Sequence, residues 1–206
     1  MTTYADVPLT DLLALSPEAQ DLLFREARTP NTFTDEPVTD EQVAAMYDLV
    51  KWAPTSMNIQ PLRVLLVRSD EARARLLGHM APGNRMKTGS APLVAVLSVD
   101  HAFHEHLHRT FPHFPGAKDV FADEAVRAHA ARLNGAMQLA YFILGVRAAG
   151  LAAGPMTGFD AAGIDAEFFA GTDRHVLAVV NVGRPGPDAW FPRSPRLDLE
   201  DVVATV

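Results

Sequence analysis

The stretch Lys51-Trp52-Ala53-Pro54-Thr55-Ser56-Met57-Asn58-Ile59-Gln60-Pro61 joins a segment with helical periodicity to an apolar, β-rich run. Proline fixes φ and biases the preceding residue toward extended geometry, so the hydroxyls and the amide between Pro54 and Pro61 lie on a restricted backbone. A loop of this kind is typical of a site that hydrogen-bonds a polar ligand. An ordinary helix-to-strand connection has a similar composition, so other segments must decide between the two interpretations.

Capping signals and apolar spacing predict the helices on either side of this loop. Thr39 and Gln42 form a capping-box pattern before apolar residues at helical spacing. Ser16-Pro17 is typical of a helix start, and Ser69 is a suitable cap for a short helix from about Asp70. The predicted helices cover 16 to about 27, 39–50, a short segment from 70, and 123–150.

Three apolar runs predict strands, at 62–67, 93–99 and 175–182. The last run, HVLAVVNV, is apolar almost throughout, which is typical of a strand buried on both faces. Strands separated by helices predict an α+β (α/β layered) fold in a single domain spanning residues 1–206. The prolines from Pro185 to Pro195 indicate an extended C-terminal arm.

Composition excludes several classes of function. The chain has 206 residues, 48% of them hydrophobic, which is enough material for a core. Its net charge of −7 disfavours nucleic acid and anionic membranes as partners. The lack of cysteine removes disulfides and thiol catalysis. Residues 1–15 lack the pattern of a signal peptide, and no apolar run reaches the roughly 18 residues that span a bilayer. We therefore expect a soluble, cytoplasmic protein.

The helix predicted at 123–150 carries an apolar stripe that includes Leu133, Met137 and Tyr141. Beyond residue 136 its opposite side is apolar as well, with Phe142 and Val146. A helix that is apolar all round is buried on all sides. In a chain of this size a neighbouring subunit is expected to supply part of the cover, although a central helix of a monomer fits the same pattern.

Several catalytic signatures are missing. The sequence has no G-x-G-x-x-G after a strand, no P-loop and no G-x-S-x-G elbow. His104 and His108 lie one helical turn apart, a spacing that metal sites use. The histidine-rich segment 101–113 ends in a Phe-Pro-rich stretch, however, and this favours a solvated or covering helix over a metal site. We expect no resident metal.

Polar residues gather in five segments, one of which is the loop described above. Each one alone has an ordinary explanation as a turn, a loop or a solvated tail. Their glycines, amides and guanidiniums would together suit a planar, phosphorylated ligand. The segments are 27–33, 54–60, 83–87, 154–160 and 192–196.

Taken in this order, the segments resemble the flavin-dependent nitroreductase family. The loop Pro54 to Pro61 matches the family's P-[ST]-S-x-N-x-Q-P element closely, and Gly154-Pro155-Met156-Thr157-Gly158-Phe159-Asp160 is similar to its flavin turn. Within the family the sequence looks closest to the malonic semialdehyde reductases of pyrimidine catabolism, through Lys51 to Pro61, Ala149 to Asp160 and Phe168 to Gly171. The resemblance implies a mixed sheet flanked by helices and an intertwined homodimer with FMN at the subunit interface.

The resemblance also implies roles for individual residues. The phosphate of FMN would be bound by three arginines, Arg28, Arg193 and Arg196. The ribityl chain or the pyrimidine edge would be contacted by Thr29 and Asn31. The partner subunit would supply the flavin contacts of the loop, which are Pro54, Thr55, Ser56 and Asn58. The pyrimidine ring would be faced by Asn84 and Lys87, and flavin N5 by the backbone N–H of Thr157 or Gly158.

The resemblance further implies ping-pong hydride transfer, in which NADH or NADPH reduces FMN before a small-molecule acceptor binds. The hydride is carried by FMN, so we expect no catalytic side chain, and Lys87 tunes the flavin. Asn31 stands where the family often has a basic residue, which leaves Lys87 as the cation expected beside the flavin ring. The acceptor's carboxylate would meet Arg109 or the histidine segment. Malonic semialdehyde is the expected acceptor; the alternatives are a broad nitroaromatic, quinone or enone reductase and a non-catalytic flavin-binding protein.

Overall fold

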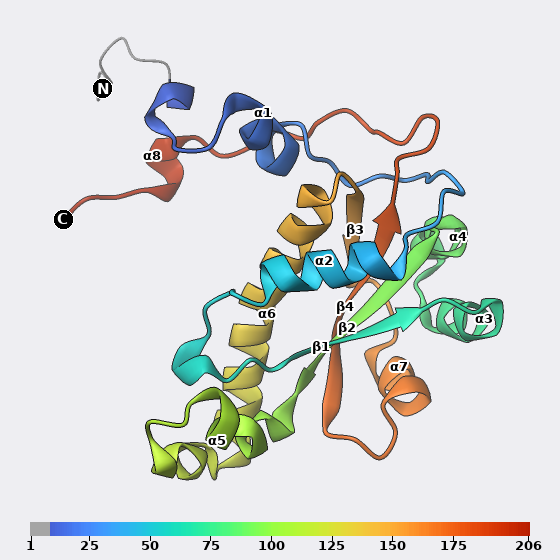
Figure 1. Ribbon diagram of the computed structural model, residues 1–206. Coiled ribbons are helices and arrows are strands. Elements are labelled where there is room, and N and C mark those ends of the chain that lie inside the picture. Colours follow the sequence, from blue (N-terminus) through green and yellow to red (C-terminus); the bar gives the residue numbers. More distant parts are fainter. Residues whose placement is uncertain (1–8) are drawn as a thin grey trace.

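A four-stranded sheet in the order β1-β2-β4-β3 forms the centre of the computed structural model, which describes residues 9–206 (Figure 1). All three strand pairs are antiparallel. The sheet is therefore antiparallel rather than mixed, which corrects that part of the expectation, while the α+β class is confirmed. The strands are β1 Leu62–Val67, β2 Leu93–Asp100, β3 Ala152–Met156 and β4 Arg174–Gly183.

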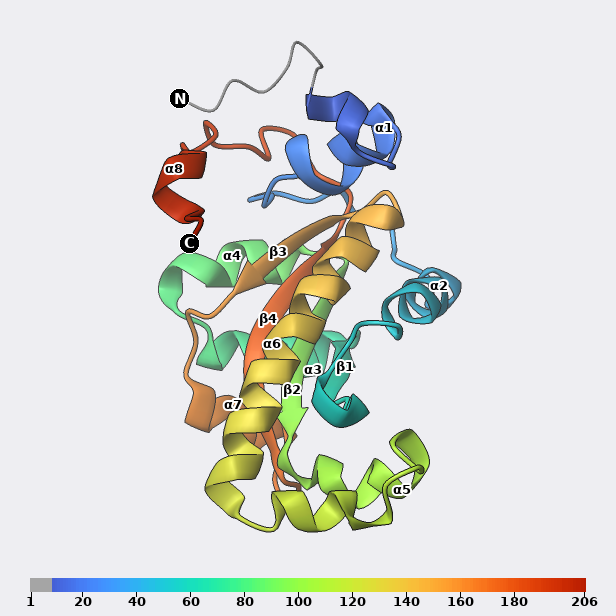
Figure 2. The same cartoon turned by 90° about the vertical axis from the view of Figure 1, so that its left-hand side faces the viewer.

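Helices cover both faces of the sheet. The α-helices are α1 Pro17–Gln20, α2 Asp40–Val50, α3 Asp70–His79, α4 Pro82–Ser90, α5 Leu107–Thr110, α6 Glu124–Ala148, α7 Ala161–Phe168 and α8 Leu199–Val202. Short 3-10 or π turns are η1 Leu9–Leu12, η2 Asp21–Arg25, η3 Ser56–Asn58, η4 His101–His106 and η5 Pro115–Phe121. Figures 1 and 2 show α2 and α6 over one face, and α3, α4 and α7 over the other.

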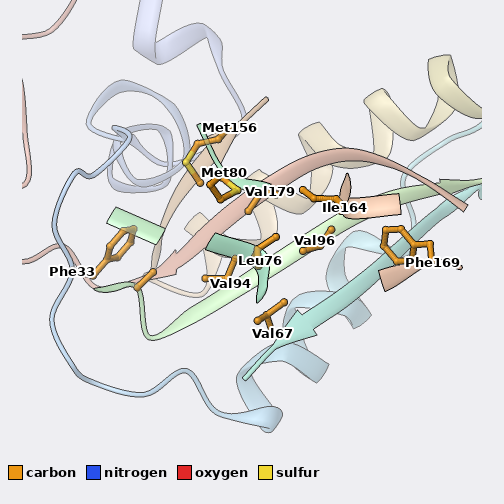
Figure 3. Packing of buried hydrophobic residues seen from close by; sticks show 11 residues of the cluster. Phe33, Val67, Leu76, Met80, Val94, Val96, Met156, Ile164, Phe169 and Val179 are labelled. Carbon is orange, nitrogen blue, oxygen red and sulfur yellow. The ribbon is translucent and has the colours of Figure 1, made fainter. Parts of the chain in front are cut away.

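Each face has its own hydrophobic core. On the face of α3, α4 and α7, Leu76 and Ile164 pack with Val94, Val96 and Val179 of the sheet (Figure 3). On the opposite face, Met46 of α2 and Phe142 and Val146 of α6 pack against β2 and β4. The central strand β2 is buried along its whole length because it lies between both layers. Helix α6 approaches α2 so closely that a Cβ on Gly145 would lie 2.3 Å from Val50 Cγ1.

Most capping predictions are confirmed. The N–H of Gln42 donates to Thr39 Oγ1 at 3.2 Å, and the N–H of Thr39 donates to Gln42 Oε1 at 2.9 Å. Ser16 and Ser69 cap α1 and α3 as expected, and α6 begins near residue 123 as predicted, with Asp123 as its cap. The first helix ends at Arg25 rather than near residue 27, because η2 replaces its last turn.

Two elements differ from the prediction. The residues Gly154 to Met156, interpreted as a turn, belong to strand β3. Glycine and proline disfavour central strands, but β3 is an edge strand, where a residue without an N–H is tolerated. Helix α4 was not predicted because it contains Gly83 and Gly89 and few apolar residues; Pro82 at its first turn favours the helical start.

No helix of the described part of the chain is long and apolar enough to cross a membrane. The predicted lack of a leader concerns residues 1–15, of which 1–8 lie outside the described residues.

Candidate functional site

The C-terminal arm is tied to the segment after the first helix. The N–H of Asn31 donates to the Ala189 carbonyl at 2.9 Å, and the N–H of Thr34 donates to the Arg184 carbonyl at 3.0 Å. The Thr32 hydroxyl donates to the Pro187 carbonyl at 2.6 Å. Because of these bonds, the residues that follow position 189 run close to the end of η2.

This arrangement brings the three predicted phosphate ligands together. A pocket of about 180 Å³ is lined by Ala27, Arg28, Thr29, Asn31, Trp190, Phe191, Pro192, Arg193, Ser194 and Arg196. Arg193 lies 4.0 Å from Glu26, and Arg28 has no ion pair among residues 9–206. Guanidinium groups present paired N–H donors that match phosphate oxygens. The pocket is therefore cationic and polar.

Asn31 has a structural task at this pocket. Its side-chain Nδ2 donates to the Ala189 carbonyl at 3.3 Å, beside the bond made by its backbone N–H. The amide nitrogen therefore helps to hold the arm beside the pocket that Asn31 lines.

The turn after β3 is docked on α4. Asn84 Nδ2 donates to the Gly158 carbonyl at 2.9 Å, and the N–H of Ala81 donates to the same oxygen at 3.0 Å. A Cβ on Gly158 would lie 2.7 Å from Asn84 Nδ2, so a side chain here would displace the Asn84 amide from this contact. The N–H groups of Thr157 and Gly158 are exposed and donate to no acceptor in the part of the chain that the structure describes. They are free to donate to a ligand.

Lys87 lies on the same face of α4 as Asn84, because residues three apart on a helix are neighbours. The residue is half-buried, and its ammonium group makes no ion pair with any residue of the described chain, 9–206. A cation without a protein partner, one helical turn from the residue that contacts Gly158, makes this edge suitable for a ligand that carries or gains negative charge.

The loop between α2 and β1 has an unusual backbone. Met57, Asn58 and Gln60 have φ values of 48°, 51° and 43°, in the left-handed region that residues with a Cβ rarely adopt. Each such residue costs about 1–2 kcal/mol. Strain of this kind persists only where surrounding contacts impose it, and it concentrates at functional sites. The prolines alone do not explain the conformation.

Two side chains of α6 impose it. Asn134 Oδ1 accepts the Ser56 N–H at 2.7 Å, and Gln138 Oε1 accepts the Leu62 N–H at 3.0 Å. Asn134 is itself buried, and its Nδ2 donates to the Ala130 carbonyl at 2.8 Å. Within the loop, Thr55 Oγ1 accepts the Gln60 N–H at 3.2 Å. Sequence reasoning missed both α6 residues; two amides four residues apart in an apolar helix were the available signal.

Within one chain the loop at 54–60 lies far from the arginine pocket and from the turn at Thr157 and Gly158 that packs on α4. Figures 1 and 2 place the loop near α5 at the lower end of the molecule, and the arm at its upper end. The structure therefore brings the predicted residues together as two separate groups. The loop's own polar surface lines a hollow of about 360 Å³ with Tyr47, Trp52, Thr55, Asn58 and Gln60.

The histidine segment forms a packed cover at the loop's end of the sheet. Phe103 and Leu107 are buried against Ile59 and Phe121, so the segment is helical and covering, as predicted. Asn58 Nδ2 donates to the Thr110 carbonyl at 2.7 Å, which joins the loop to this cover. His104 and His108 do not converge: His104 lies beside the Glu105 carboxylate and His108 Nδ1 lies 2.9 Å from the Glu105 carbonyl.

A second cationic pocket lies where the loop meets this cover. It has a volume of about 230 Å³ and is lined by Ile59, Gln60, Arg63, His106, Arg109 and Thr110. Arg63 is paired with Asp100 at 3.0 Å, so its charge is largely neutralised. Arg109 makes no ion pair within residues 9–206 and supplies the pocket's free positive charge.

Beyond this pocket, the start of the cover carries one perturbed histidine. Burial lowers the pKa of His101 from its usual value, and the neighbouring His175 lowers this pKa further. The two rings lie 4.4 Å apart, centre to centre. His101 is therefore held in its neutral form at neutral pH.

Comparison with known proteins identifies the family. The model of the nitroreductase family matches residues 24–184. A candidate NADH dehydrogenase/NAD(P)H nitroreductase of Streptomyces coelicolor is 68% identical over 195 residues, covering 94% of this chain and 99% of that protein.

Solved structures agree at the level of the fold. A candidate nitroreductase from Exiguobacterium sibiricum, in complex with FMN, superimposes with a TM-score of 0.80 at 18% identity, over 91% of this chain and 96% of that one. A candidate NAD(P)H:FMN oxidoreductase from Staphylococcus epidermidis gives a TM-score of 0.80 at 17% identity, over 94% and 98%. The chain belongs to the nitroreductase family.

Proposed function

We propose that the protein is an FMN-dependent NAD(P)H oxidoreductase. The observation that carries this proposal is the pocket into which the arm and the segment after η2 bring Arg28, Arg193 and Arg196. Three guanidiniums fit a phosphate monoester dianion such as that of FMN. The name of the Streptomyces coelicolor relative and the FMN held by the Exiguobacterium sibiricum structure support the same assignment.

The second part of the proposed flavin site is the turn at Thr157 and Gly158, together with Asn84 and Lys87 of α4. Its free Thr157 and Gly158 N–H groups suit a ring nitrogen, and Asn84 and Lys87 suit the pyrimidine edge. When bound, FMN supplies hydride-transfer chemistry that no side chain of this protein provides. The positive charge of Lys87 favours negative charge on a ligand at this edge. No side chain is needed as a nucleophile.

We propose that the site is completed by a second copy of the chain. The loop at 54–60 is held in a strained shape, yet in its own chain it faces no part of the arginine pocket. Large apolar side chains are exposed beside it, including Trp52 (77%), Tyr47 (65%) and Leu133 (56%). An apolar groove of about 400 Å³ runs between α2, β1 and α6. A homodimer that covers this face buries the apolar stripe of α6 and carries each loop to the partner's flavin.

The acceptor is proposed to be a small aldehyde with a carboxylate, with malonic semialdehyde as the first to test. The pocket at Arg109 shares Gln60 with the loop, so an anion bound there lies beside the loop's polar surface. Its volume of about 230 Å³ suits a molecule of a few heavy atoms. The net reaction consumes one NAD(P)H and one proton for each malonic semialdehyde reduced to 3-hydroxypropionate.

A broad reductase of nitro compounds and quinones is the second candidate, favoured by the nitroreductase name of the 68% identical relative. Steady-state rates with malonic semialdehyde and with menadione, an uncharged quinone, separate the two. The account predicts that Arg109→Ala raises the KM for malonic semialdehyde by about 10- to 100-fold, since a charge-assisted hydrogen bond contributes roughly 1.5–3 kcal/mol.

In Arg109→Ala the KM for menadione is expected to be unchanged, because menadione carries no charge for Arg109 to bind. Arg132→Ala on α6, an exposed arginine outside the pocket, is the matched control. Saturation by quinones and nitro compounds, without saturable turnover of malonic semialdehyde, would favour the broad reductase.

A further inference from the structure

A group of two histidines and one aspartate lies at the far end of β2 and β4. His101 follows β2, while Asp173 and His175 lie at the start of β4. Each of the three offers one ligand atom, and these atoms lie within 4.8 Å of one another. The backbone holds the two segments together, because the N–H of His101 donates to the Asp173 carbonyl at 2.8 Å.

The ring of His175 is aimed by a second carboxylate. Its Nδ1 lies 3.1 Å from Asp165 Oδ2, while Asp165 Oδ1 accepts the Val176 N–H at 2.7 Å. The carboxylate is fixed by the backbone, and in the tautomer that carries its proton on Nδ1 it accepts a hydrogen bond from that N–H, which leaves the lone pair of the ring on Nε2. A carboxylate behind a histidine in this way is the usual support of a metal-binding imidazole.

The Nε2 atom then faces the other carboxylate at a distance that a hydrogen bond does not explain. His175 Nε2 and Asp173 Oδ1 are 3.8 Å apart, beyond hydrogen-bonding range. Two ligand atoms bound to one tetrahedral zinc, each at about 2.0–2.2 Å from the ion, are separated by roughly 3.4 Å. Both side chains are about half exposed (49% each), which leaves them room for a small closing movement.

We propose that His101, Asp173 and His175 form a Zn²⁺ site, with solvent in the fourth position and Asp165 as the residue that positions His175. Two imidazoles and one carboxylate suit zinc rather than Mg²⁺ or Ca²⁺, which take oxygen ligands. The site is separate from both cationic pockets and from every residue assigned to the flavin. Zinc bound here joins the start of the histidine cover to the start of β4.

The test is titration of tag-free, EDTA-dialysed protein with ZnCl₂ by calorimetry, and with Co²⁺ by visible absorption. The wild type is expected to bind one zinc per chain saturably, and Co²⁺ is expected to give the visible bands of a low-coordinate site. His175→Ala and Asp173→Asn each remove one ligand and are expected to abolish both signals. Asp165→Asn keeps all three ligands and is expected to weaken zinc binding by about 10- to 100-fold.

His129→Ala, an exposed histidine on α6, is the matched control and is expected to bind zinc as the wild type does. Far-UV circular dichroism in EDTA checks that every variant is folded. Zinc binding with the same stoichiometry and affinity in the wild type and in folded Asp173→Asn would overturn the proposal, and so would the absence of saturable binding by the wild type. Reductase activity is not the readout, so the result is independent of the proposed function.

Discussion

The buried amide of Asn134 gives the sharpest prediction about the loop at 54–60, which we propose contacts the flavin. Asn134→Ala removes the acceptor that holds the Ser56 N–H at 2.7 Å. The loop then keeps three left-handed residues, at about 1–2 kcal/mol each, with one anchor fewer. An amide N–H left without its partner costs about 1–3 kcal/mol. The loop is therefore expected to relax out of its strained shape in the free protein.

A ligand that needs the strained shape must restore it on binding. The same roughly 1–3 kcal/mol is then lost from the binding energy, which corresponds to a Kd for FMN that is about 5- to 150-fold weaker. Because relaxation is local, the melting temperature is expected to fall by only a few degrees, at about 2–4 °C per kcal/mol for a chain of this size. The assay is quenching of FMN fluorescence on titration of the apoprotein, with His129→Ala as the exposed control on the same helix.

Two results would refute this reasoning. An unchanged FMN Kd in Asn134→Ala would mean that the loop needs no anchor or does not contact the flavin. A lower melting temperature with unchanged FMN affinity would mean that Asn134 stabilises the fold without preparing the loop for its ligand.

Three further predictions concern charge and assembly. Lys87→Met is expected to leave the fold intact and to slow flavin reduction by NADH or NADPH about 10-fold or more, as measured by anaerobic stopped flow. A 10-fold slower rate corresponds to an activation free energy that is higher by ~1.4 kcal/mol. Unchanged reduction kinetics would remove Lys87 from the mechanism. Met137→Asp places a charge on the exposed apolar stripe of α6. This variant is expected to be monomeric, and the wild type dimeric, in size-exclusion chromatography with light scattering. The same elution for both proteins would place the interface elsewhere. Because the pKa of His101 is lowered in the folded state, the unfolded chain binds more protons near pH 6. In EDTA the free energy of unfolding is therefore expected to fall as the pH drops below about 6.5. His101→Gln should flatten this slope, and an equal slope in both proteins would contradict the argument.

Elements with local signals were predictable from the sequence. The capping box at Thr39 and Gln42 and the apolar runs of β1, β2 and β4 need only neighbouring residues to be recognised. Strand β3 was missed because its glycine and proline disfavour a central strand, and nothing local marks an edge position.

The residues of the candidate site could be proposed from the sequence, but their arrangement in space could not. The five polar segments were found by residue type and order, and the structure places Arg28 beside Arg193 through hydrogen bonds between distant parts of the chain. The left-handed backbone at Met57 and Gln60 has no glycine to announce it. Its anchor, Asn134, is remote in sequence, as is the pairing of His101 with His175. Such features depend on tertiary contacts that spacing along one chain does not encode.

The central claim is that this chain binds FMN and passes electrons from NAD(P)H to an acceptor. The most direct test is an anaerobic absorbance titration of FMN-loaded protein with NADH and then NADPH, followed by addition of malonic semialdehyde. The account predicts that a donor bleaches the visible flavin bands and that the acceptor restores them. Protein that retains no FMN, or bound FMN that neither donor bleaches, would contradict it.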